Sequence, residues 1–126
     1  MSKKKGGLSS EQLSQIVVKG MQEKKAEEIV VMDLRDIQNS VADFFVICSG
    51  NSDTHIDAIA ESVDKEVYQS DEQDPWHREG YNNKTWVLLD YVDVVVHVFN
   101  QDRREFYQIE SLWGDARITK HNEIKV

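Results

Sequence analysis

The sequence is poor in cysteine and has no long apolar run, and each shortage excludes a class of protein. Cys48 is the only cysteine among 126 residues, which excludes an internal disulfide and a zinc site made of several cysteines. No segment approaches the roughly 18 consecutive apolar residues that a transmembrane helix needs. The basic run Lys3–Lys5 is not followed by the apolar segment of a secretory signal. We therefore expect a cytoplasmic protein that does not bind a membrane.

Basic side chains are also scarce relative to acidic ones. The chain has 15 Lys and Arg against 23 Asp and Glu, which gives a formal net charge of -8. This balance speaks against direct nucleic-acid recognition, because phosphates are bound by clustered Lys and Arg. It favours solubility or electrostatic steering toward a basic partner.

The length fits one domain. We expect a flexible basic tail over residues 1–7, a folded domain over residues 8–115 and a mobile C-terminal tail over residues 116–126, where the hydrophobic pattern is weak.

Hydrophobic periodicity and turn residues predict the elements of this domain. Helices are expected from Ser9 to about Lys24 and from Asp53 to Gln69, the second with Ser52 as its N-cap. A short helical stretch is expected from Asn100 to Trp113. Strands are expected over Ile29–Met32, Ala42–Cys48, Trp76–Tyr81, Thr85–Leu89 and Val94–Phe99. This order predicts an α/β (α+β) fold with a mixed sheet of about five strands and helices packed on it.

The turn Ser49–Ser52 is a candidate phosphate site, because it leads from a strand into a helix N-terminus. The same residues also suit an ordinary turn with a helix cap. A metal-dependent nucleotidyltransferase that uses this turn, with Asp43, Asp90 or Asp93 as metal ligands, is the alternative function. Such an enzyme needs two carboxylates at i and i+2 on one strand. The acidic pairs with that spacing fall on a predicted helix and in a loop. We therefore expect no catalytic site, metal site or cofactor.

Three single residues are candidates for a chemical or binding role. Cys48 lies within an apolar strand and is expected to be inert packing. His97 lies between two valines and is expected to be a hydrogen-bonded, partly buried histidine. Trp76 follows an acidic loop, where it could be a half-exposed binding anchor or an edge aromatic folded onto the core.

Several blocks of the chain form a recognisable set. They are Ala42–Ser52, His55, Glu79–Gly80, Trp86–Tyr91, Asp93–Phe99, Arg104, Phe106–Tyr107, Glu110 and Leu112–Asp115. Taken together they resemble the ribosomal silencing factor family, also called Iojap-type proteins, from about Leu8 to Asp115, with the blocks in the family's order and spacing. The family commonly has glycine where this chain has Val92. Because a β-branched residue is costly at positive φ, we expect a different turn type there.

The resemblance implies a nucleotidyltransferase-like fold without catalysis. It implies binding to the large ribosomal subunit through ribosomal protein number fourteen. This binding would block joining of the small subunit and lower translation when nutrients are scarce. By their position, the expected partner-binding residues are Trp76, Glu79, Tyr81, Asp90, Tyr91 and Asp93. A surface made for a partner could also pair with itself, so a homodimer of the free protein is expected.

Overall fold

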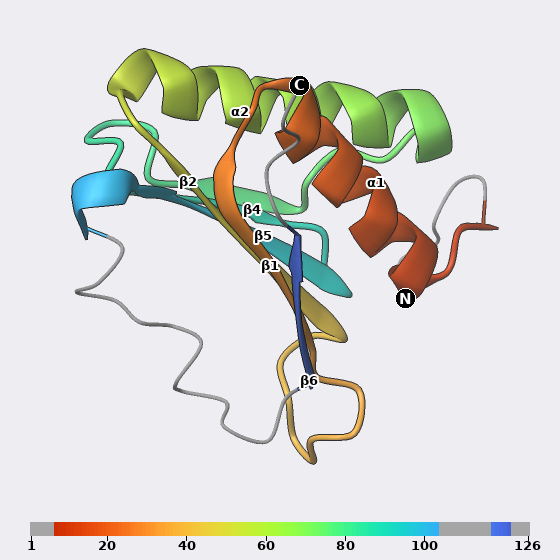
Figure 1. Ribbon diagram of the computed structural model, residues 1–126. Coiled ribbons are helices and arrows are strands. Elements are labelled where there is room, and N and C mark those ends of the chain that lie inside the picture. The colour runs from red at the N-terminus through yellow and green to blue at the C-terminus, as the bar shows by residue number, and fades with distance from the viewer. Residues whose placement is uncertain (1–6, 104–116, 122–126) are drawn as a thin grey trace.

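The computed structural model describes residues 7–103 and 117–121 (Figure 1). It contains two α-helices, a six-stranded sheet and a short 3-10 helix. The elements in chain order are α1 Ser10–Glu23, β1 Glu27–Asp33, β2 Phe44–Gly50, α2 Asp53–Asp71, β3 His77–Glu79, β4 Trp86–Asp90, β5 Val94–Asn100, η2 Gln101–Arg103 and β6 Arg117–His121.

The strands form one mixed sheet in the order β3-β4-β5-β2-β1-β6. β2 and β5 are parallel, and every other neighbouring pair is antiparallel. The predicted α+β class with a mixed sheet is confirmed. The sheet has six strands, however, and the expectation of about five was wrong.

The additional strand, β6, lies in the stretch that was expected to be a mobile tail. It pairs antiparallel with β1, from Asp33↔Arg117 to Ile29↔His121. Residues 117–120 are all exposed because β6 is an edge strand. Without alternating buried side chains, its sequence carries no strand periodicity.

Both helices begin where the sequence predicts. The Ser9 hydroxyl accepts a hydrogen bond from the Gln12 N–H, and the Gln12 side chain accepts one from the Ser9 N–H, which completes a capping box. Ser52 caps α2 through the N–H of His55. α2 continues two residues beyond the expected Gln69 and ends at Glu72, which adopts a left-handed φ of 52°.

The two helices lie together on one face of the sheet (Figure 1). Gly20 allows them to approach, since a Cβ there would lie 2.9 Å from the Cα of Val63. One buried apolar cluster fills the space between helices and sheet, and a second contains residues from the strands and the β1–β2 loop, among them Met32, Leu34 and Phe45. β2 is buried along its whole length. It runs on through Ser49 and Gly50, which had been expected to end it.

After β5, the predicted helical stretch begins as η2, and its continuation to Trp113 lies outside the described residues. Among the described residues, no helix has the length and apolar character that crossing a membrane requires.

Candidate functional site

Three segments that are distant in the sequence meet at one end of the sheet. They are the β1–β2 loop (34–43), the α2–β3 connection (72–76) and the β4–β5 turn (91–93). The backbone N–H groups of Asp43 and Phe44 both donate to the carbonyl of Asp93, at 2.8 and 3.1 Å, and the Trp76 N–H donates to the carbonyl of Asp90 at 2.7 Å. These bonds hold the segments as one surface, which we call the acidic end.

The acidic end exposes large apolar side chains. Trp76 is 76% exposed, and Val41 and Val92 are 70% and 48% exposed. Tyr68 is also exposed and lies on the last turn of α2, just before the α2–β3 connection. Apart from Ile118 on β6, these are all the exposed large apolar side chains in the described part of the chain. Trp76 is therefore on the surface, and the alternative that it folds onto the core is wrong. Apolar side chains gathered on a surface mark an interaction site.

The same three segments, with the last residue of β4, also carry carboxylates that are exposed or half-buried. They belong to Asp36, Asp43, Glu72, Asp74, Asp90 and Asp93. The nearby cations are already paired, Arg35 with Asp33 and Arg117 with Asp36. The surface therefore combines apolar contact area with negative charge, which complements a basic protein surface.

The β4–β5 turn holds Val92 in a strained conformation. The Asp93 N–H donates to the Tyr91 carbonyl at 2.9 Å and closes a three-residue turn around Val92, whose φ is 76°. The Val92 N–H donates to Oδ1 of Asp90 at 2.7 Å. The expectation of a turn that avoids positive φ was wrong, because these bonds impose the conformation. Strain of this kind clusters at functional sites.

The expected partner-binding residues occupy different parts of this region. Trp76, Asp90 and Asp93 lie at the acidic end. Glu79 lies farther along β3, with its Oε2 2.7 Å from Nε2 of His77. In the β3–β4 register His77 pairs with Asp90, so these side chains share one sheet face with Glu79. β3 is the edge strand of the sheet. Trp76, Asp90 and Glu79 can thus belong to one surface that follows this edge.

The two tyrosines are less exposed than the other candidates. Tyr91 is only 2% exposed, and burial raises the pKa of its hydroxyl, which has no hydrogen-bond partner within residues 7–103 and 117–121. This corrects the expectation that Tyr91 adds exposed contact area, since its ring is part of the core. Tyr81 is partly buried against the same core, and burial raises its pKa as well.

Sequence reasoning missed Val41 and Tyr68 as surface residues and treated Val92 only as a turn residue. The exposure of Val41 could have been suspected, since it is an apolar residue at the end of a polar loop. Nothing in the sequence indicated that Tyr68 is exposed, because an aromatic residue on an amphipathic helix is as often buried as exposed.

Two backbone donors of the candidate phosphate turn are occupied. The Asn51 N–H donates to Nδ1 of His55 at 3.0 Å, and the His55 N–H donates to the Ser52 hydroxyl at 3.0 Å. Gly50 is needed for packing, because a Cβ there would lie 2.8 Å from Cγ1 of Ile56. Nε2 of the same His55 ring lies 2.8 Å from the Lys24 carbonyl. The turn is thus built as a joint between α1, β2 and α2.

The candidate metal ligands Asp43, Asp90 and Asp93 belong to segments that meet at the acidic end. Within residues 7–103 and 117–121, no three His, Cys, Asp or Glu side chains are grouped to hold a metal ion. Cys48 is buried, as expected. His97 is also buried, and its Nδ1 accepts a hydrogen bond from the Trp86 indole at 3.0 Å. The expected hydrogen bond is present, but the ring is buried rather than partly buried, and Nε2 has no partner among the residues that the structure describes.

Comparisons with known proteins agree with this architecture. The family model described as "Ribosomal silencing factor during starvation" matches residues 8–126. The chain is 44% identical over 109 residues to "Ribosomal silencing factor RsfS" of Halalkalibacterium halodurans, covering 86% of this chain and 92% of that protein. The Bacillus subtilis protein of the same name is 39% identical over 109 residues, covering 86% and 91%. A crystal structure of a Chromobacterium violaceum protein superposes with a TM-score of 0.79 at 29% identity, covering 85% of this chain and 88% of that one. With a matching family model over nearly its whole length and close relatives along most of it, the chain belongs to the ribosomal silencing factor family.

Proposed function

We propose that this protein binds the large ribosomal subunit through ribosomal protein number fourteen and sterically blocks joining of the small subunit. Translation would then fall when nutrients are limiting. The observation that carries the proposal is Trp76, 76% exposed and held beside the strained β4–β5 turn by the hydrogen bond from its N–H to Asp90. An exposed tryptophan at a fixed position is the usual anchor of a protein interface.

The acidic side chains near Trp76 favour a basic protein as the partner. The side chains of Asp90, Asp93 and Glu79 would face Lys and Arg of a basic ribosomal protein. Exposed ion pairs contribute only about 0–1 kcal/mol each. These charges therefore set the encounter rate and the orientation of the complex, while Trp76, Val41 and Val92 supply most of the affinity.

The proposed mechanism needs no catalytic step, metal ion or cofactor. The protein acts in the cytoplasm as a stoichiometric wedge, and its effect saturates when every large subunit is occupied. The exposed apolar side chains of the acidic end would also be a self-association surface in the free protein, so a homodimer would have to dissociate before the ribosome is bound.

A sedimentation profile of mixed ribosomal subunits tests the proposal. Added in excess, the protein should reduce the fraction of joined ribosomes and sediment with the large subunit. Trp76→Ala should need about 30-fold more protein for the same effect, since loss of an anchor costs about 2 kcal/mol.

The matched control is Ile118→Ala, which removes an exposed apolar side chain from β6, at the opposite edge of the sheet. This variant should inhibit joining as well as the unmodified protein. Unchanged joining in the presence of excess protein would overturn the proposal. Equal losses in both variants would place the docking surface elsewhere.

A further inference from the structure

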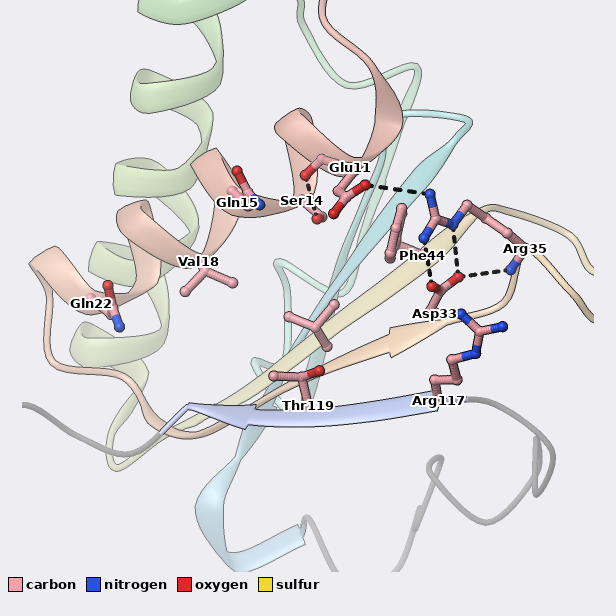
Figure 2. Close-up of a pocket in the computed structure, with 11 residues that line it drawn as sticks. Glu11, Ser14, Gln15, Val18, Gln22, Asp33, Arg35, Phe44, Arg117 and Thr119 are labelled. Atoms are coloured by element: carbon pink, nitrogen blue, oxygen red, sulfur yellow. Dashed lines mark hydrogen bonds and ion pairs between the residues drawn. The ribbon is translucent and has the colours of Figure 1, made fainter.

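A groove of about 420 Å³ lies between α1 and the β1–β6 edge of the sheet (Figure 2). It exists because the helices pack mainly over β2 and β5, so that β6 extends beyond the cover of α1. Val18 of α1, Val31 of β1 and Phe44 of β2 provide its apolar lining. We call it the α1–β6 groove.

One end of the α1–β6 groove carries fixed charges of both signs. Arg35 donates from Nε and Nη2 to the two oxygens of Asp33 at 3.0 and 2.8 Å, and its Nη1 lies 3.5 Å from Oε1 of Glu11. Its guanidinium lies 4.8 Å from the centre of the Phe44 ring. The hydrogen bond from Arg35 lowers the pKa of Asp33, so this pair remains ionised at neutral pH. Arg117 of β6 reaches the same end (Figure 2).

The sides of the α1–β6 groove are polar but uncharged. Gln15 and Gln22 project from α1, and Thr119 projects from β6 (Figure 2). Neither glutamine side chain has a hydrogen-bond partner among residues 7–103 and 117–121, so both amides are available to a ligand. Convergent polar groups around an apolar floor are the usual composition of a small-molecule pocket, and the volume lies within the usual range of roughly 300–1,000 Å³.

We propose that the α1–β6 groove binds a small zwitterion of the α-amino-acid type with an apolar side chain. The ligand's ammonium lies against the carboxylate of Glu11, its carboxylate against the guanidinium of Arg117, and its side chain on Val18 and Val31. Glu11 and Asp33 disfavour phosphates and other polyanions, while the two arginines disfavour simple cations. A molecule with both charges satisfies this lining.

Binding requires only a small adjustment of the protein. Arg117 pairs with Asp36, and the two side chains are 72% and 73% exposed. Because such a surface ion pair contributes little stability, the ligand carboxylate can replace Asp36 at the guanidinium. Arg35 keeps its bonds to Asp33 and forms the rigid end wall.

The test is an NMR titration of the full chain with L-leucine, N-acetyl-leucine and leucinamide. The first has both charges, the second lacks the ammonium and the third lacks the carboxylate. L-Leucine should give saturable shifts at the backbone amides of Gln15, Gln22 and Thr119, and each capped compound should bind at least about tenfold more weakly, equivalent to about 1.4 kcal/mol. No saturable shift up to the solubility limit, or equal binding of all three compounds, would overturn the proposal.

Two variants locate the site. Thr119→Trp should fill the α1–β6 groove and abolish binding, whereas Lys120→Trp places the same bulk on the opposite face of β6 and should leave binding unchanged. Both positions are exposed, so the fold should tolerate either change. Glu11→Gln removes the partner of the ammonium without changing its size and should weaken L-leucine about tenfold. Unaltered binding in Thr119→Trp would contradict the assignment to this groove.

Discussion

The turn after β2 and the turn after β4 both reverse the chain within a few residues, yet they serve opposite purposes. In the first, the N–H groups of Asn51 and His55 are bonded within the turn and the His55 ring ties it to Lys24. In the second, Val92 is held at a φ of 76° and its side chain faces solvent.

The difference shows how structural and binding turns can be told apart. A turn whose donors are bonded internally and whose apolar side chains are buried has neither free donors nor apolar contact area with which to bind a partner. A turn that stores backbone strain and exposes apolar side chains beside carboxylates has a surface still to be covered. The β2–α2 turn should therefore affect stability, and the β4–β5 turn should affect binding.

The largest expected effect on stability is that of Gly50→Ala, in the β2–α2 turn. The new Cβ would lie 2.8 Å from Ile56 Cγ1 and 3.3 Å from both Ile56 N and Ile59 Cδ1. Such overpacking should lower the free energy of unfolding by about 3 kcal/mol in urea denaturation. Asn51→Ala is the matched control, because it keeps the N–H that His55 accepts, and it should change stability by less than about 0.5 kcal/mol. Equal effects would mean that the turn is not tightly packed.

His97 lies in the core. Its Nδ1 accepts a hydrogen bond from the Trp86 indole, whereas its Nε2 has no partner among the described residues. Burial lowers its pKa to about 4 in the folded state, against about 6.5 in the unfolded chain. Between pH 6.5 and pH 4 the His97 imidazole is protonated in the unfolded chain but remains neutral in the folded protein. Stability should thus be complete above pH 6.5 and fall by about 2 kcal/mol at pH 5.

Urea denaturation at pH 7 and pH 5 measures this loss. His97→Phe is the control, since phenylalanine fills a similar space without titrating. The variant should lose most of the difference between the two pH values. A pH dependence that persists unchanged in His97→Phe would assign it to other groups.

His55→Ala is expected to have a smaller effect. It removes the acceptor of the Asn51 N–H and the hydrogen bond between Nε2 and the Lys24 carbonyl. Because these groups are close to the surface and water can replace the ring, the free energy of unfolding should fall by about 1–2 kcal/mol. Inhibition of subunit joining should be unchanged once the folded fraction is accounted for. A specific loss of inhibition would mean that this turn contacts the partner after all.

The smallest expected effect, and one of opposite sign, is that of Val92→Gly. Glycine relieves the strain at positive φ but adds entropy to the unfolded chain, so the free energy of unfolding should rise by about 1 kcal/mol. Inhibition of subunit joining should weaken, because an exposed apolar side chain is lost.

Val41→Gly is the matched control for this variant. Val41 is exposed like Val92 but is not among the residues at positive φ, so the substitution should lower stability slightly. If the two variants destabilise the protein equally, the β4–β5 turn is not strained.

Local signals in the sequence were sufficient for much of the fold. Ser9 and Ser52 mark the helix starts because capping depends only on neighbouring residues. The successive apolar residues of β2 predict a strand with both faces covered. Trp76 could be proposed as a binding anchor from its place after an acidic loop, whereas Asp90 and Asp93 were assigned to a binding surface only with the resemblance to a family. β6 was missed, since an exposed edge strand has no hydrophobic period to detect.

The helix caps, the buried strands and the family can be recognised in the sequence, because they depend on short-range patterns and on residue identity. The tertiary structure buries Tyr91 and joins the segments that carry the exposed Val41, Trp76 and Val92. It also decided that Val92 is forced to positive φ and that a groove opens beside α1. Each of these depends on backbone hydrogen bonds or packing between segments that are distant in the chain, and no local pattern encodes which segments will meet.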